Sequence, residues 1–347
     1  MEGRLIMQSR EYYSWVDILK GLGIILVILG HLQVAPNLIS YIYLFHMPLF
    51  FFVSGYLMNV NKFAKVTDFI KGKTKTLLLP YLGFSIISII CYSVFTGAEI
   101  SIKESFICFI EGKRNFIYYN IALWFLVGIF VVELMYFLLK KYIKNDILIF
   151  LVSIFISFSA VVFLEVIQSP DWIWSIDTAF YYLVYFVIGN LLKSHQKKYS
   201  ASNFVQKSIM YTIVFLSFSL NLILLLIPSK IQFVYSIING KNEFLFVWLF
   251  ICGLSGIVTY IVISKYLGKS SVLEFIGKNS LIIFTLHYPL GILIIDLLKV
   301  QLQIELPPSN IIGIIQMILI LLLLKPVISI INNKFPFLIG NKLNFKS

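Results

Sequence analysis

Residues 15–32 read WVDILKGLGIILVILGHL. Apart from Asp17, Lys20 and His31, every residue of this run is apolar or glycine. An α-helix needs about 20 mainly apolar residues to cross the hydrocarbon core of a bilayer, so the run is long enough to span one. It is also longer than the apolar part of a signal peptide, and no small-residue cleavage site follows it. We therefore expect a retained transmembrane helix near the start of the chain.

The composition of the whole chain agrees with that first helix. Of 347 residues, 59% are hydrophobic and 13% are charged, and the mean hydropathy is +0.92, whereas soluble domains are about 45–50% apolar and about 25% charged. Ten apolar segments are candidates for transmembrane helices: 14–33, 39–59, 77–96, 121–139, 147–167, 178–192, 209–227, 244–264, 281–298 and 309–331. The polar connections between them are short, the longest being about 20 residues. The sequence therefore predicts an all-α, polytopic membrane bundle of about ten transmembrane helices, in a single domain over 1–347.

The basic residues indicate how such a bundle is oriented. Lys and Arg number 20 in the two terminal segments and the loops on their side, against 6 in the loops on the opposite side. Because cytoplasmic loops carry the excess of basic residues, both termini are expected in the cytoplasm of a plasma-membrane protein. The net charge of +12 belongs to these loops, so membrane lipid is an expected partner and nucleic acid is not. The three cysteines are widely separated and predict neither a disulfide framework nor a zinc site.

Three ionisable residues interrupt the first predicted helix. Asp17, Lys20 and His31 follow one another at steps of 3 and 11 residues, and at about 100° per residue these steps return to roughly one face of a helix. A rise of about 1.5 Å per residue separates Lys20 from His31 by about 16 Å. Ionisable groups are costly inside a membrane and commonly mark a functional pathway, and an imidazole suits proton transfer. The alternatives are a structural Asp17–Lys20 ion pair and a hydrogen-bonded core histidine.

A second histidine opens the next predicted helix, in the stretch FHMPLFFFVSGY over 45–56. Only a short hairpin joins this helix to the first, so His46 is expected at a depth similar to that of His31. Two histidines at one depth indicate a reaction centre. Alternatively, His46 caps backbone groups that Pro48 leaves free.

The order of several motifs carries a family resemblance. The run from Asp17 to Gly23, leading to His31, and the run over 45–56 are the first two, and the later ones are 75–81, 123–126, 174–179 with Phe186 and Gly189, and 276–287. In this order they resemble the membrane-bound acyltransferase family 3, which includes the fucose 4-O-acetylase-like proteins. The resemblance covers nearly the whole chain. Its most specific part is the lysine and the histidine separated by ten residues in the first helix.

The resemblance implies transfer of an acyl group, acetyl in particular, from cytoplasmic acyl-CoA to a hydroxyl of a cell-surface or envelope saccharide. His31 is then the general base or the acyl carrier. The other implied residues of the reaction site are His46, Asp17, Asp177 and His287, and those implied on the acetyl-CoA side are Lys20, Lys75, Asn279 and Ser280. Two of these lysines stand where many relatives carry arginine, which removes bidentate recognition of phosphate.

Some points follow less directly. No metal is expected, and because the chain ends soon after the last predicted helix, no appended soluble domain is expected either. The membrane domain then acylates its acceptor itself, or a separate extracellular transferase completes the reaction. Glu133, Glu165 and Asp296 are interpreted as packing partners.

The alternative functional class is a transporter or flippase of envelope saccharide precursors. Such proteins commonly consist of two related halves, and no repeat is visible in this sequence.

Overall fold

The computed structural model describes residues 14–165, 172–200, 204–227, 229–238, 241–303 and 307–340, and within these ranges the regular structure is entirely helical. The longer helices are α1 (Ser14–Gly30), α3 (His46–Leu57), α5 (Leu79–Thr96), α7 (Trp124–Tyr142), α8 (Asp146–Phe163), α9 (Ile176–Ser200), α10 (Phe204–Leu226), α12 (Asn242–Tyr266) and α16 (Asn310–Lys334). The shorter helices are α2 (Pro36–Tyr43), α4 (Val66–Lys73), α6 (Ile102–Glu111), α11 (Ser229–Ile238), α13 (Ser271–Lys278), α14 (Ser280–Leu286) and α15 (Leu293–Leu302). Short turns of helix are η1 (Val60–Lys62), η2 (Thr74–Leu78), η3 (Ile173–Ser175), η4 (His287–Ile292) and η5 (Pro336–Ile339).

Each of the ten predicted segments coincides with a helix or with consecutive helices. Eight stretches of the described residues are long and apolar enough to cross a bilayer: Pro36–Leu57, Val66–Thr96, Asp146–Phe163, Ile173–His195, Ser208–Leu226, Asn242–Tyr266, Ser280–Leu302 and Asn310–Lys334. The first and fourth predicted segments are occupied by α1, of 17 residues, and α7, of 19 residues. The predicted all-α, polytopic membrane fold is therefore confirmed. Residues 166–167, at the end of the fifth segment, lie outside the described ranges.

Two of the long stretches contain a wide, π-type turn beside a proline. The turn η2 ends just before Pro80, and η4 contains Pro289. Proline has no backbone N–H and its ring clashes with the preceding helical turn, and one wide turn absorbs the mismatch without ending the helix. The ninth predicted segment is therefore not one regular helix but the series α14, η4 and α15. His287 is the first residue of its wide turn.

The connection between α5 and α7 is more ordered than a polar loop. It contains α6, which begins after Ser101 and ends just before Gly112, whose φ is +55°. The Ser101 hydroxyl accepts a hydrogen bond from the Glu104 N–H. The ten residues of α6 are too few to cross a membrane, which is why hydropathy alone did not indicate it. The helix delivers the chain to the residues that precede α7, and these residues form part of the site described below.

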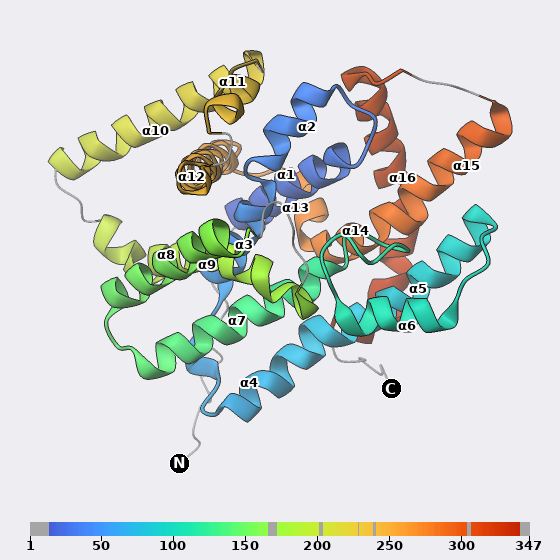
Figure 1. The fold of residues 1–347 in the computed structure, drawn as a ribbon, viewed down its shortest axis with the longest axis horizontal. Coiled ribbons are helices and arrows are strands. Elements are labelled where there is room, and N and C mark those ends of the chain that lie inside the picture. Colours follow the sequence, from blue (N-terminus) through green and yellow to red (C-terminus); the bar gives the residue numbers. More distant parts are fainter. Residues whose placement is uncertain are drawn as a thin grey trace.

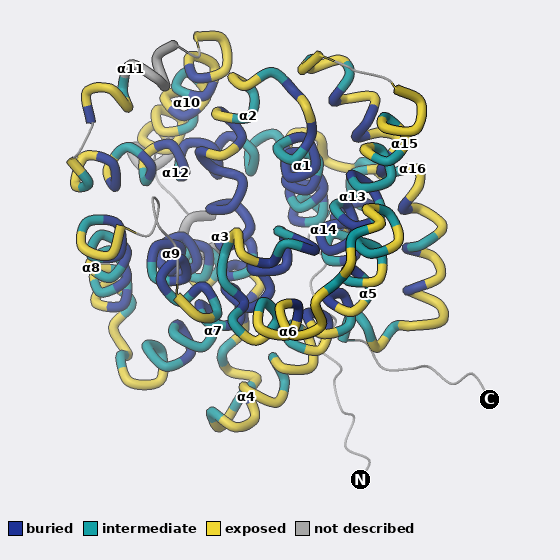
Figure 2. The backbone as a smooth tube through the Cα atoms, turned by 45° about the vertical axis from the view of Figure 1, so that its right-hand side comes forward, coloured by how far each residue is buried: buried dark blue, intermediate teal, exposed yellow. Residues whose placement is uncertain are grey.

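The centre of the bundle is built on α1, α3 and α9. Figure 2 shows long buried stretches in these helices and exposed stretches along α8, α10 and α16 at the edge. The contact between α3 and α9 is a backbone contact, because a Cβ added at Gly55 would lie 1.9 Å from the Phe186 carbonyl oxygen and one at Gly189 would lie 2.0 Å from that of Phe52. Small residues allow such close helix packing in membranes. This contact holds α3, and with it His46, against the core.

The perimeter helices expose large apolar side chains. Examples are Phe155 on α8, Phe215 on α10 and Ile318 on α16. A soluble protein rarely exposes such a continuous apolar surface, but in a polytopic helical protein it is the surface that contacts lipid. Figure 1 shows α10 and α16 on opposite sides of the bundle, with α1 and α3 between them.

Candidate active site

The first helix carries the stripe of ionisable residues from one end to the other. At its beginning, the Asp17 carboxylate pairs with the Lys20 ammonium at 2.7 Å, and both side chains are partly buried. At its end, His31 follows directly after Gly30, and its backbone N–H donates to the Ile28 carbonyl in the last turn. We call these the Lys20 end and the His31 end of α1. The ion pair that the sequence allowed as a structural alternative is thus present at the Lys20 end.

One continuous part of the chain, from α13 to η4, covers this helix along its length. At the Lys20 end α1 and α13 touch through their backbones: a Cβ added at Gly277 would lie 1.8 Å from the Asp17 carbonyl oxygen, and one at Gly21 would lie 2.3 Å from that of Leu273. Farther along, α14 packs on α1. At the His31 end the ring of His287 lies 5.3 Å from the ring of His31, centroid to centroid. The predicted penultimate helix therefore supplies a wall for both ends of the stripe.

His287 is fully buried against His31. Its Nδ1–H donates to the Phe284 carbonyl oxygen at 2.7 Å, so the lone pair of the neutral ring is on Nε2. Within the described ranges Nε2 has no hydrogen-bond partner. A buried polar atom without a partner is uncommon and marks places where a ligand or a reaction supplies one. The geometry leaves a proton acceptor beside His31.

His46 caps backbone at the end of α2, and not the groups that Pro48 leaves free. Its Nδ1–H donates to the Ile42 carbonyl oxygen at 2.9 Å, which caps the last turn of α2 and fixes the ring. Its ring also lies 4.9 Å from that of Tyr43, and it is buried with 6% of its surface exposed. The capping bond again leaves Nε2 as the nitrogen with a lone pair. His46 is therefore oriented by backbone and also lines the pocket described next.

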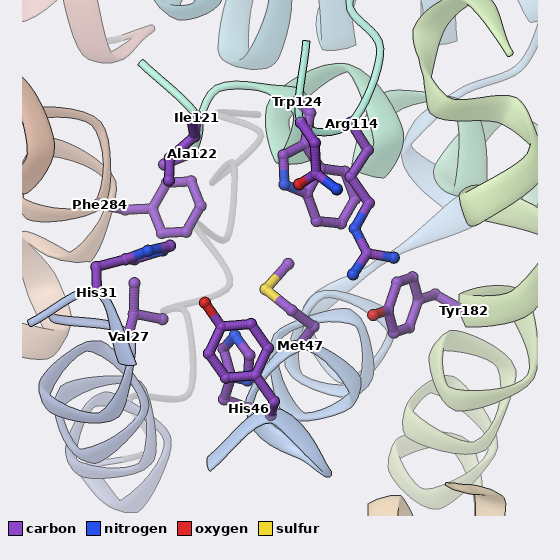
Figure 3. Close-up of a pocket in the computed structure, with 12 residues that line it drawn as sticks. Val27, His31, His46, Met47, Arg114, Ile121, Ala122, Trp124, Tyr182 and Phe284 are labelled. Atoms are coloured by element: carbon purple, nitrogen blue, oxygen red, sulfur yellow. The ribbon is translucent and has the colours of Figure 1, made fainter. Parts of the chain in front are cut away.

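A pocket of about 110 Å³ brings the two histidines together. Figure 3 shows His31 on one side, His46 and Met47 near the middle, and Arg114 on the far side. The lining residues come from the ends of α1, α2, α3 and α7, from α9 and α14, and from the connection before α7. They are Val27, His31, Tyr43, His46, Met47, Arg114, Asn115, Ile121, Ala122, Trp124, Tyr182 and Phe284. No carboxylate is among these lining residues. In the described part of the chain, no three His, Cys, Asp or Glu side chains cluster as metal ligands would.

Arg114 is the residue of this pocket that motif reasoning missed. Its guanidinium lies over the Trp124 ring, with Cζ 5.4 Å from the centroid, and the ring of Trp124 lies 6.4 Å from that of Tyr182. A signal was present in the sequence: Arg114 is the only arginine after residue 10, in a chain whose other cations there are all lysines. It stands in the connection after α6 and belongs to no motif that we recognised.

Asp177 is buried but is not among the lining residues of the pocket. Its carboxylate accepts hydrogen bonds from the backbone N–H groups of Trp172 and Thr178, at 3.1 and 2.6 Å. It thereby anchors the tight turn before α9, in which Trp174 and Ser175 have φ of +57° and +52°, values that are costly for residues other than glycine. The Ser175 hydroxyl in turn donates to the Gly112 carbonyl at 2.9 Å. The turn that Asp177 anchors is therefore bonded to the connection that carries Arg114.

The residues expected on the acyl-CoA side are divided between two places. Asn279 and Ser280 follow α13, which packs on the Lys20 end of α1. The Asn279 side chain is engaged, since it donates to the Phe275 carbonyl and accepts from the Asn332 amide. Lys75 lies on η2, which packs on α4, α5 and α7, and its side chain is exposed.

Three other carboxylates were interpreted as packing partners. Glu133 on α7 is one: it pairs with the Lys73 ammonium at 2.8 Å and accepts a hydrogen bond from the Ser54 hydroxyl at 3.1 Å. This buried pair joins α3, α4 and α7. Asp296 pairs with Lys299 at 3.2 Å but is largely exposed. Glu165 is exposed just after α8, so it is not a buried packing partner.

Comparison with known proteins identifies the family of the chain. A family model described as an acyltransferase domain, that of the acyltransferase 3 family, matches residues 13–329. No curated protein and no solved structure gives a match. The matched range includes the whole of α1, the pocket and η4, and it covers most of the chain. The chain therefore belongs to the acyltransferase 3 family and is a multi-pass membrane acyltransferase.

Proposed function

We propose that this protein transfers an acyl group, acetyl in particular, from cytoplasmic acyl-CoA to a hydroxyl of a cell-surface or envelope saccharide. The observation that carries the proposal is the placement of His31. It lines the same pocket as His46 and stands at the opposite end of α1 from Lys20. The ring of His287 lies beside that of His31, with an Nε2 that has no hydrogen-bond partner among the described residues. A single helix thus joins a cationic end to a pocket that contains bases.

The proposed orientation follows from the distribution of basic residues. With both termini in the cytoplasm of a plasma-membrane protein, the Lys20 end of α1 faces the cytoplasm and the His31 end faces outward. Acyl-CoA approaches from the Lys20 end, where a cation complements its phosphates. Along α1 the distance from Lys20 to His31 is about 16 Å at about 1.5 Å per residue. The long pantetheine arm of acyl-CoA suits such a separation between phosphates and thioester.

Two routes are consistent with this placement. In the direct route, His31 takes the proton of the acceptor hydroxyl while its oxygen attacks the thioester carbonyl; the C–S bond then breaks, and the proton passes to the CoA thiolate. In the carrier route, a nitrogen of neutral His31 attacks the thioester carbonyl, the C–S bond breaks, and the proton of the other ring nitrogen passes to the CoA thiolate. The acceptor oxygen then attacks the acyl-imidazole, loses its proton and regenerates His31. Either the acceptor is the saccharide itself or a separate extracellular transferase takes the acyl group onward.

Radiolabelled acetyl-CoA tests the proposal on the full-length protein in lipid nanodiscs. Wild-type protein is expected to transfer label to a hydroxyl-bearing saccharide extracted from the envelope of its own cells. His31→Ala is expected to lose a factor of about 10² to 10⁴ in rate, which is the usual cost of removing a general base. The matched control is His195→Ala, because His195 is a histidine that lies partly exposed on α9, far along the helix from Tyr182.

The outcomes separate the proposal from its rivals. Label that remains on wild-type protein in the absence of acceptor identifies the carrier route, and label found only on saccharide identifies the direct route. Near-normal transfer by well-folded His31→Ala overturns the role of His31. The same protein in sealed proteoliposomes tests the rival class: movement of unmodified saccharide across the membrane, without any incorporation of label, overturns the acyltransfer itself and supports a transporter.

A further inference from the structure

The pocket contains one permanent positive charge, that of Arg114. It lies on the connection between α6 and α7, and the other side chains that line the pocket are histidines, aromatic residues and uncharged residues. A guanidinium keeps its charge in any protein environment and offers five N–H donors. Each of these donors needs a hydrogen-bond acceptor.

The described part of the protein does not provide a hydrogen-bond acceptor for every N–H donor of Arg114. The Nη1 atom of Arg114 is buried and has no hydrogen-bond partner within the described residues, and none of the described residues that line the pocket is Asp or Glu. A buried donor of a guanidinium without an acceptor is costly, and an anionic group of a ligand is the partner that suits it. The Trp124 ring, with its centroid 5.4 Å from Cζ, gives the guanidinium a cation–π partner.

The position of Arg114 indicates which substrate brings the anion. Figure 3 shows its guanidinium across the pocket from His31, with His46 and Met47 between them. On the proposed function, the phosphates of acyl-CoA stay at the Lys20 end of α1, about 16 Å away from His31 along the helix. The anion at Arg114 therefore belongs to the acceptor. A sugar ring held there by its anionic group fills the space between the guanidinium and the imidazole of His31.

We propose that Arg114 binds a carboxylate or phosphate group of the acceptor, and that the acceptor is an acidic saccharide. This inference rests on the proposed function and adds the substrate class to it. The aromatic rings of Trp124 and Tyr182 stand beside the guanidinium and offer apolar faces to the same sugar. Carboxylate and phosphate both match the two parallel N–H donors of an arginine. Arg114 is thus a specificity-determining residue, and His31 remains the residue that meets the reacting atoms.

The test uses membranes that contain the full-length protein together with its native acceptors. After incubation with radiolabelled acetyl-CoA, saccharides are separated by anion exchange, and the label that mild base releases is measured in the acidic and neutral fractions. Wild-type label is expected in the acidic fraction. The labelled saccharide is then deacetylated and returned as acceptor in three forms: intact, with its carboxyl groups reduced to alcohols, and with its phosphodiesters cleaved. The form that loses activity tells a uronate from a phosphodiester.

Variants of Arg114 complete the test. Arg114→Gln is expected to raise the KM for the acidic acceptor about 10- to 100-fold, the usual effect of losing a charged hydrogen bond, while the KM for acetyl-CoA stays the same. Arg114→Lys keeps the charge without the fork and is expected to be intermediate. Lys113→Gln is the matched control, because the neighbouring Lys113 pairs with Glu111 and does not line the pocket.

Each result decides the inference. Wild-type label in the neutral fraction, or an unchanged acceptor KM in Arg114→Gln, overturns the acidic acceptor while acyltransfer stands. Because the wild-type distribution needs no variant, it decides the matter even if Arg114→Gln fails to fold. Absence of any label that depends on the wild-type protein overturns the proposed function, and this inference with it.

Discussion

The imidazole rings of His31 and His287 lie against each other, with centroids 5.3 Å apart and planes inclined by 33°. The two residues come from opposite ends of the chain, and His287 is fixed by the bond from its Nδ1 to the Phe284 carbonyl. Its Nε2 is a buried proton acceptor without a partner among the described residues. Two adjacent imidazoles are suited to pass a proton between them.

His287→Ala is therefore expected to lower kcat about 10- to 100-fold, less than the loss for His31→Ala, because His31 still meets the reacting atoms. The KM for acyl-CoA is expected to stay the same, since His287 is far from the Lys20 end of α1. Steady-state kinetics on purified protein checks this, with thermal stability as the measure of folding. Equal kcat in the variant and in wild type would show that the burial of His287 is purely structural.

Lys20→Ala is expected to raise the KM for acyl-CoA because it removes the cation at the beginning of α1. The effect is expected to be smaller with a truncated donor, acetyl-pantetheine, which lacks the distal phosphates. Lys62→Ala, which removes an exposed lysine on η1, is the control. If the KM rises equally for acetyl-CoA and for acetyl-pantetheine, Lys20 serves only as the ion-pair partner of Asp17, at 2.7 Å.

The proposed orientation predicts which loops an impermeant thiol reagent reaches in intact cells. A cysteine at Asn37, at the start of α2, is expected to react, whereas one at Asn61, on η1, is expected to be shielded until the membrane is opened. The three native cysteines are free and are first replaced by alanine. Reversed labelling of the two positions would place His31 on the cytoplasmic side.

A matched pair of glycine substitutions tests the contact that holds α3 on α9. Gly189→Ala is expected to destabilise the protein by about 1–3 kcal/mol, the usual cost of overpacking, because its Cβ would lie 2.0 Å from the Phe52 carbonyl oxygen. Gly128→Ala on α7 is expected to be tolerated, since its nearest neighbour is the Trp124 ring at 3.5 Å. Thermal unfolding in detergent measures the stability of both variants. Equal stability of the two would mean that α3 and α9 move apart enough to accommodate the added methyl group.

Much of the fold followed from local properties of the sequence. All ten hydrophobic segments coincide with helices, because the need to bury about 20 apolar residues in lipid is a property of each segment by itself. The helical step likewise placed Lys20 and His31 at opposite ends of one helix. The wide turns at η2 and η4 and the short α6 were not foreseen, since a proline allows several local solutions and ten residues give a weak hydropathy signal.

The amino-acid sequence by itself determined that this is a helical membrane protein with an acyltransferase family motif, and that His31 and His46 lie near each other in a hairpin. Only the tertiary structure decided that His287 faces His31, that Asp177 anchors a turn, and that Arg114 completes the pocket. The turn at Asp177 is local but follows no pattern that predicts it, whereas the neighbours of His287 and Arg114 come from segments far apart in the chain. Their distances are set by where helices cross, through backbone contacts such as Gly55 on Phe186 and Gly277 on Asp17, and no local pattern encodes that crossing.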